Sequence, residues 1–294
     1  MMYRLMLARV ALQKLGLAIG LWSALQPCAA HAQASHRLQW DPAWHRVGSF
    51  GYVLSGVSVL GAAVVLLLPG YPSESRWSGP VLFDNGVREA LRARDPALRD
   101  AIRTASDITL LTTVLQTVMF DGLVIPLADH SPNLAAQLSL INVQAFALTT
   151  LVSTVLFKTV ARARPLMTDC ELNSGSDPLC KIGSYASFPS SHASTAFTAA
   201  GLSCAHHAAL PLYGGAWDLA ACLGSLAFAT ATGVFRIVGD RHYATDVLMG
   251  TAIGLTFGYL YPRLVHYRGD SERSVAAPPP SAAIPLFMSI GGTL

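Results

Sequence analysis

Residues 219–262 read LAACLGSLAFATATGVF-RIVGDRHYATD-VLMGTAIGLTFGYLYP, and this stretch decides the fold class. Two apolar runs, 219–235 and 247–262, flank a polar connection that holds every charged residue of the stretch. Each run approaches the roughly 20 residues that an α-helix needs to cross the hydrocarbon core of a bilayer. The pattern predicts two membrane helices whose charged connection lies at one membrane surface.

Four further apolar runs extend this pattern along the chain. They cover residues 47–73, 108–128, 134–157 and 193–217, and no alternating strand pattern stands out between them. Of all residues 52% are hydrophobic and only 13% are charged, whereas soluble domains carry about 25% charged residues. We therefore predict an all-α, multi-pass helical membrane bundle with about six apolar helices.

The N-terminus has the features of a secretory signal peptide. Basic residues precede the apolar run 15–25, and Ala30-His31-Ala32 offers a small-x-small cleavage site. The alternative is an uncleaved first membrane helix. The predicted organisation is a signal peptide over 1–32, an apolar helix with an amphipathic surface segment over 33–104, a catalytic helical bundle over 105–267 and a disordered tail over 268–294. Within the second part, residues 87–103 are predicted to form a surface helix that Pro96 interrupts.

Charged and titratable side chains gather where the apolar runs end. In a compact bundle these ends can converge at one membrane surface, where charges cost little free energy and form a single polar pocket. The residues are Lys158, Arg162, Arg164, His192, Arg236, His242 and Asp246.

These residue types suit the binding of a phosphate ester. Arg164 and Arg236 can bind phosphate oxygens bidentately, and Lys158 can add a point charge. Ser190 and Ser191, directly before a predicted helix, add hydroxyl groups and free backbone N–H groups.

Two histidines supply the chemistry of phosphoryl transfer. Neutral His242 can attack phosphorus to form a phosphohistidine, and Asp246, one helical turn later, would hold the other ring nitrogen. His192 would give a proton to the leaving alkoxide and then activate water. This scheme requires no metal and no cofactor.

The three segments resemble the signatures of the type 2 phosphatidic acid phosphatase superfamily. Those signatures are Lys, six residues, Arg-Pro; then Pro-Ser-Gly-His; then Ser-Arg, five residues, His, three residues, Asp. The third signature keeps its spacing here, with Phe235 in place of Ser. The second reads Pro-Ser-Ser-His, with Ser191 in place of Gly. In the first, KTVARARP at 158–165, only five residues separate Lys158 from Arg164, and strict register would place Phe157 at the lysine position. Arg162 is the candidate replacement for that cation.

The resemblance covers about residues 134–262 and implies a helical bundle with a phosphatase site. The predicted protein is a metal-independent membrane phosphatase that hydrolyses a phosphate monoester or diphosphate of a lipid through a phosphohistidine. Phosphatidate, phosphatidylglycerophosphate, undecaprenyl diphosphate and lipid A phosphate all remain open as substrates, as does the oligomeric state. The net charge of +3 is too small to suggest a nucleic-acid partner.

Three other functions fit parts of the same pattern. A lipid phosphotransferase would pass the phosphoryl group to an acceptor other than water. A vanadate haloperoxidase shares the anion pocket, although the membrane character argues against it. A transporter or scaffold would use the same polar residues at helix ends without chemistry.

The side of the membrane that holds the site depends on conflicting signals. A cleaved signal followed by six crossings would put the site in the cytoplasm, as would the arginines of 74–103 under the positive-inside rule. Membrane members of the family usually work on the outer face, and Cys170 and Cys180 share a loop that suits an oxidising side. We predict a bacterial-type inner membrane protein with its site facing the periplasm. Cys204 and Cys222 lie in apolar runs and are predicted to be small core residues.

Overall fold

The computed structural model describes residues 37–67, 72–172 and 185–268. The predicted signal peptide and almost all of the predicted tail lie outside the described residues. Within the described ranges the regular elements are helices, and an isolated β-bridge pairs Trp77 with Arg162. The prediction of an all-α bundle is confirmed.

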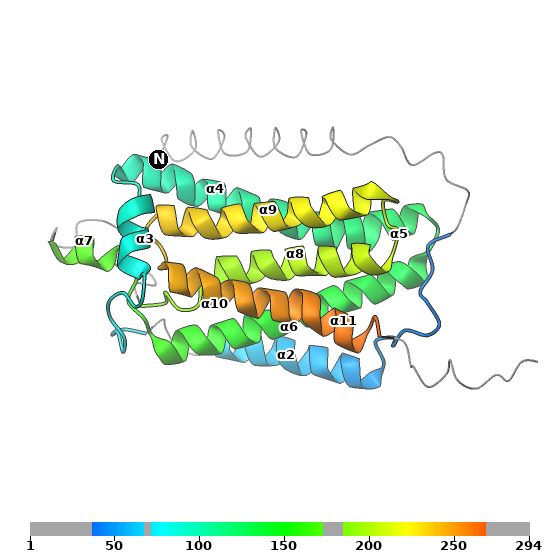
Figure 1. Cartoon of the computed structure of the whole chain (residues 1–294). Helices are drawn as coiled ribbons and strands as arrows, with labels where there is room; N and C mark the ends of the chain where they lie inside the picture. The colour runs from blue at the N-terminus through cyan, green and yellow to red at the C-terminus, as the bar shows by residue number, and fades with distance from the viewer. Residues whose placement is uncertain (1–36, 68–71, 173–184, 269–294) are drawn as a thin grey trace, which may run out of the picture.

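The long helices lie side by side and run across the view in Figure 1. The helical elements are α2 (Ser49–Leu67), α3 (Asp84–Leu91), α4 (Pro96–Leu115), η1 (Gln116–Val124), α5 (Ile125–Ala128), α6 (Pro132–Val160), α7 (Met167–Leu172), α8 (Ser191–Ala209), α9 (Ala216–Val238), α10 (Ala244–Leu255), η3 (Thr256–Leu260) and α11 (Tyr261–Val265). The segments η1 and η3 are π-helical, so that α4–η1–α5 and α10–η3–α11 each form one continuous rod.

Three of the rods are long and apolar enough to cross a membrane. They span Pro96–Ala128, Pro132–Val160 and Ala216–Val238, and Ser49–Val65 is a shorter apolar helix. Large apolar side chains cover the outside of α2, where Phe50 is 79% exposed and Leu67 is 84% exposed. The protein is an integral membrane protein whose apolar surface faces lipid.

Helix α8 lies at the centre of the bundle and packs against α4, α6, α9 and α10. Its side chains are small, mostly Ala, Ser, Thr and Gly, and nearly all residues from Ala193 to His207 are buried. Small side chains let neighbouring backbones approach closely in a membrane bundle.

A row of glycines presses α10 and η3 against α8. A Cβ atom at Gly250 would lie 2.5 Å from the Ser190 carbonyl oxygen, and one at Gly254 would lie 2.5 Å from the Ser194 carbonyl oxygen. Gly258 continues the row one turn later against Thr198. The second and third sequence signatures therefore sit on helices that touch through their backbones.

Because the rods alternate in direction, the predicted site residues gather at one end of the bundle. This end, called the site end below, holds the ends of α6 and α9 and the starts of α4, α8 and α10, and α3 lies across it (Figure 1). Residues 37–47 and 266–268 lie at the opposite end, where the His45 amide donates to the His266 carbonyl.

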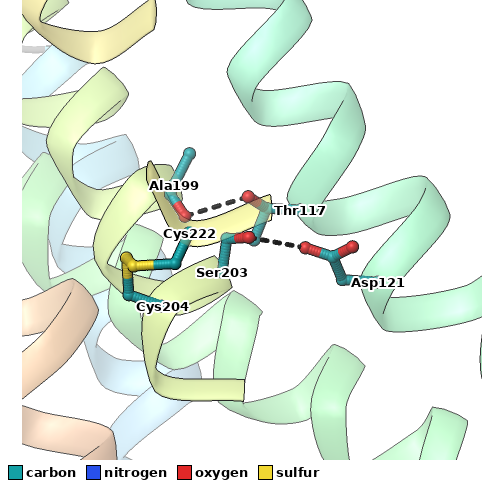
Figure 2. The surroundings of a disulfide bond; sticks show 6 residues. All are labelled: Thr117, Asp121, Ala199, Ser203, Cys204 and Cys222. Carbon is teal, nitrogen blue, oxygen red and sulfur yellow. Dashed lines mark hydrogen bonds between the residues drawn. A yellow bond between two sulfur atoms is a disulfide. The ribbon is translucent and has the colours of Figure 1, made fainter. Parts of the chain in front are cut away.

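A buried polar cluster and a disulfide bond join helices near that opposite end (Figure 2). The Asp121 carboxylate accepts hydrogen bonds from Gln116, Ser203 and the Tyr213 hydroxyl. Close by, Cys204 of α8 and Cys222 of α9 form a disulfide bond. The prediction that these cysteines are separate core residues is wrong, because the antiparallel packing of α8 and α9 brings their Cα atoms to 4.4 Å.

Two other predictions concern the segment 87–103 and the cysteine pair Cys170 and Cys180. Residues 87–103 do not form one interrupted surface helix: α3 ends at Leu91, and Pro96 is the first residue of α4, with Asp95 as its N-cap. Proline is favoured at that position because the first helical N–H has no partner within the helix. Cys170 is disulfide-bonded, but its predicted partner Cys180 lies outside the described residues.

Candidate active site

His242 lies in the short connection between α9 and α10, with a different partner on each ring nitrogen. Its Nδ1 is 2.7 Å from the Ser187 carbonyl oxygen, and its Nε2 is 3.2 Å from Nη1 of Arg164. A carbonyl oxygen only accepts hydrogen bonds, so Nδ1 carries the proton and the lone pair of Nε2 faces Arg164. This tautomer presents Nε2 as a nucleophile.

The surroundings of His242 keep its ring neutral. Burial lowers the pKa of His242 well below 6.5, and the positive charges of Arg164 and Arg236 lower it further, with a smaller contribution from His192. The hydrogen bond to Ser187 acts in the opposite direction but does not prevail. Since all three neighbours act on His242, the segments that carry the three sequence signatures converge at one place.

Asp246 acts on His242 indirectly. The distance from its Oδ2 to Nδ1 of His242 is 3.9 Å, too long for a hydrogen bond. Oδ2 instead accepts from the Ser187 hydroxyl at 2.6 Å and from the Tyr243 amide at 2.9 Å, which forms a capping box at the start of α10. The Asp246 carboxylate therefore holds Ser187, whose carbonyl orients His242. The sequence had predicted a direct contact between Asp246 and His242.

Arg162 is fully buried beneath the site. Its guanidinium lies between Asp246 at 2.6 Å and Asp84 at 2.7 Å. The rings of Trp77 and Tyr243 enclose it, at 4.1 and 4.2 Å from the guanidinium carbon. The guanidinium is thus committed to internal contacts, and Arg162 stabilises Asp246 in place of contacting a bound phosphate.

Asp84 extends this network to α3. Burial alone would raise the pKa of Asp84, but hydrogen bonds from Arg162, Thr245 and Val81 hold it below 3.8. Asp84 is therefore ionised, and Arg162 is shared by two carboxylates.

His192, the second residue of α8, faces an acidic residue of α4. Its Nε2 is 2.9 Å from Oδ1 of Asp107, and Nη1 of Arg236 lies 3.5 Å from the same oxygen. The side chains of His192 and Asp107 are 31% and 60% exposed, so this part of the site opens outward. Asp107 directly precedes the apolar run 108–128 and so lies at a run boundary like the other site residues, but it was not among the residues predicted from the sequence.

The remaining predicted phosphate ligands occupy varied positions. Ser190 is buried and caps α8, its hydroxyl accepting from the Ala193 amide at 3.4 Å. Ser191 is exposed at the first position of the helix. Lys158 is half-buried in the last turn of α6, and the contacts described above join Arg164, Arg236 and the two histidines without it.

Comparison with known proteins agrees with the residue pattern. The model of the PAP2 superfamily matches residues 139–270. A solved structure described as the first transmembrane PAP2 type phosphatidylglycerolphosphate phosphatase from Bacillus subtilis is similar to this chain at 19% sequence identity. The similarity covers 71% of this chain and 92% of that chain, with a TM-score of 0.44. The three signatures, from Lys158 to Asp246, all lie within the segment that the PAP2 superfamily model matches.

Proposed function

We propose that this protein is a membrane phosphatase that hydrolyses a phosphate monoester or diphosphate of a lipid through a phosphohistidine at His242. The observation that carries the proposal is the tautomer of His242: Nδ1 donates to Ser187, and the lone pair of Nε2 lies 3.2 Å from the Arg164 guanidinium. A nucleophile next to a cation that can hold the phosphoryl oxygens is the arrangement that attack on phosphorus requires.

In the first step Nε2 of His242 attacks phosphorus, and the bond from phosphorus to the leaving oxygen breaks. Arg164 and Arg236 bind the non-bridging oxygens, and the exposed backbone and hydroxyl of Ser191 add donors at the start of α8. Protonated His192, held by Asp107, gives its proton to the leaving alkoxide.

In the second step water attacks the phosphohistidine. His192 takes a proton from the water, the N–P bond breaks, and inorganic phosphate leaves with His242 again neutral. The low pKa of His242 suits this role, because a neutral ring is a competent nucleophile. Once Nε2 is bonded to phosphorus the ring is cationic, with Nδ1 still protonated, so it leaves as a neutral imidazole when the N–P bond breaks. Since side chains supply each role, we propose that the reaction needs no metal ion.

A lipid substrate is supported by the position of the site. It lies at the ends of membrane helices and opens beside the exposed side chain of Asp107, so a headgroup can enter while the acyl chains stay in the bilayer. The identity of the headgroup is a question for a substrate panel.

The proposed activity is tested by measuring inorganic phosphate release from phosphatidate, phosphatidylglycerophosphate and undecaprenyl diphosphate in the presence of EDTA. Wild type should release phosphate from at least one lipid, and His242→Ala should lose at least about 10³-fold in kcat. His45→Ala, at the exposed opposite end of the bundle, is the matched control and should keep full activity. Folded wild type that releases no phosphate from any of them would contradict the proposal.

We also propose that the site faces the periplasm of a bacterial-type inner membrane. Cys170 is disulfide-bonded and lies on α7 at the site end, which supports an oxidising environment there. In this bundle an outward-facing site and a cleaved signal peptide exclude each other, because residues 37–47 lie at the end opposite to the site. In intact cells a membrane-impermeant maleimide should label Ser75→Cys at the site end and leave Ala216→Cys unlabelled; the reverse pattern refutes the orientation.

A further inference from the structure

Asp240 is a fully buried carboxylate between the phosphate ligand Arg236 and the nucleophile His242. Arg88 of α3 grips it with two hydrogen bonds, from Nε at 2.7 Å and from Nη2 at 2.9 Å. Arg92 and Arg99 approach the same carboxylate at 3.3 and 3.6 Å. Three guanidinium groups from a part of the chain outside the matched segment 139–270 therefore surround one side chain of the catalytic connection.

The backbone at Asp240 makes the turn that separates Arg236 from His242. Asp240 has φ +58°, in the left-handed region that a residue with a Cβ atom adopts at a cost. The amides of Arg241 and His242 both point back to the Arg236 carbonyl, at 3.0 and 3.3 Å. The direction in which the chain leaves this turn fixes the position of the His242 ring.

Two further hydrogen bonds hold the turn from the α3–α4 region, which also supplies Arg88. Nε of Arg103 donates to the Gly239 carbonyl at 2.9 Å, and the Ala93 amide donates to the Val238 carbonyl at 3.0 Å. By contrast, the far side of the turn meets the site itself, where Nη1 of Arg164 donates to the Arg241 carbonyl at 3.0 Å. The connection is thus clamped between the α3–α4 region and the phosphate-binding arginine.

We propose that Asp240, gripped by Arg88, is a positioning residue that holds the His242 nucleophile in line with the phosphate bound by Arg164 and Arg236. The inference rests on the proposed function and deepens it, because it assigns the α3–α4 region a part in catalysis. A nucleophile displaced by about 1 Å can cost about 10²-fold in rate even when the ligands that bind the substrate are intact. Loss of the grip should therefore lower kcat far more than it raises KM.

A set of substitutions distinguishes the role of the Asp240 carboxylate, bound by Arg88, from the role of the left-handed backbone conformation at residue 240. Asp240→Asn keeps the shape and the tolerance for a left-handed backbone but loses the charge, and Asp240→Gly keeps only the backbone freedom. Arg88→Lys keeps a charge without the two-pronged contact. Glu89→Gln is the matched control, since Glu89 is an acidic residue of α3 next to Arg88 but is exposed.

The experiment measures kcat, KM and thermal unfolding of each purified full-length variant. Asp240→Asn and Asp240→Gly should each lower kcat at least about tenfold with KM within about twofold. Arg88→Lys should keep more activity than Arg88→Ala, and Glu89→Gln should match wild type. A folded Asp240→Gly with wild-type kcat would overturn the proposal, because the backbone conformation alone would then suffice.

A binding measurement keeps this inference distinct from the proposed function. Orthovanadate, which imitates a five-coordinate phosphoryl group bonded to the attacking atom, should raise the melting temperature of wild type and not that of His242→Ala. Asp240→Asn should weaken this vanadate affinity at least about fivefold, a change that corresponds to about 1 kcal/mol. If wild type binds vanadate but hydrolyses none of the lipids, the proposed function fails while the clamp is still tested; equal vanadate affinity in Asp240→Asn and wild type refutes the clamp.

Discussion

At His242, two neighbours act on opposite sides of one imidazole ring. The Ser187 carbonyl fixes the proton on Nδ1, and Arg164 lies against Nε2. Because Asp246 binds the hydroxyl of Ser187, it supports the tautomer through one intervening residue. A second carboxylate, Asp107, does the corresponding work at His192 by direct contact.

The depressed pKa of His242 makes stability depend on pH. In the folded protein the ring stays neutral as the pH falls through 6.5, whereas the unfolded chain takes up a proton there. The free energy of unfolding should therefore decrease on acidification, by up to about 1.4 kcal/mol per pH unit below 6.5 for this one group. Denaturant titrations from pH 7.5 to 5.5 should show a shallower pH dependence for His242→Gln than for wild type. Parallel curves would show that folding does not lower the pKa of His242.

Asp107 is expected to be required for proton donation by His192. Asp107→Asn keeps the size of the side chain but replaces a carboxylate that stabilises the imidazolium by a neutral amide. We expect kcat to fall by about 10- to 100-fold, with the alkaline limb of the pH–rate profile displaced to lower pH. The pH profile is the measurement that matters, since a purely structural loss would lower the rate at all pH values alike.

The site residues at the boundaries of apolar runs were predictable from the sequence, whereas the contacts between distant segments were not. His192, Arg236 and His242 were predicted together because each lies where an apolar run ends. Arg162 was selected by the same criterion, but its buried position could not be predicted, since its aromatic partner Trp77 lies 85 positions earlier and the two residues pair through an isolated backbone bridge. The spacing between Lys158 and Arg164, one residue shorter than in the family signature, falls where the chain leaves α6. This helix ends at Val160, and Ala161 takes a left-handed conformation with φ +48° that redirects the chain before Arg162.

At the scale of elements, the contact between α8 and α10 sets the distance between the two histidines. His192 is the second residue of α8 and His242 lies two residues before α10, and the glycine row at 250, 254 and 258 lets the two rods touch through their backbones. The sequence shows these glycines within an apolar run, but their regular four-residue spacing became meaningful only once the facing helix was known.

Substitution within the glycine row should separate the two helices. A Cβ atom at Gly254 would lie 2.5 Å from the Ser194 carbonyl oxygen and 2.8 Å from Cβ of Phe197, which neither backbone can avoid without moving. Gly254→Ala should destabilise the protein by about 1–3 kcal/mol and lower activity. Thermal unfolding in detergent is the measurement, and Gly56→Ala on α2, where the added atom meets nothing within 4 Å, is the matched control. Equal losses in both variants would argue against the close contact.

Helix ends were harder to predict than helix cores. The run 193–217 contains the end of α8, a connection and the start of α9, because Leu210, Pro211 and Leu212 are as apolar as the helices that they join. Pro96 was predicted to interrupt a helix and instead begins one. In both places local composition is ambiguous, and tertiary packing decides where the helix stops.

At the scale of the whole molecule, the helical bundle was predictable from the apolar runs, whereas the contacts that distant segments make at the site end were not. The alternation of rods places both described ends of the chain opposite the site, and the chain arrives at the site end three times before the catalytic connection is complete. Regions outside the matched segment contribute Asp84, Arg88 and Asp107 to that end, so the family signatures by themselves describe only part of the site.

The disulfide between Cys204 and Cys222 should stabilise the bundle as a whole. It closes a loop with a sequence separation of 18 residues, for which the reduced entropy of the unfolded chain corresponds to about 3 kcal/mol. The double variant Cys204→Ser, Cys222→Ser should lose about that amount in a denaturant titration. An unchanged midpoint would mean that the bond adds nothing beyond the packing of α8 on α9.

The same bond makes α8 and α9 a covalent hairpin whose two arms carry His192 and Arg236. A protease that cuts the exposed connection near Pro211 or Gly215 would break the chain and leave the arms attached to each other. On a non-reducing gel the nicked protein should migrate as one species, and a reductant should release two fragments.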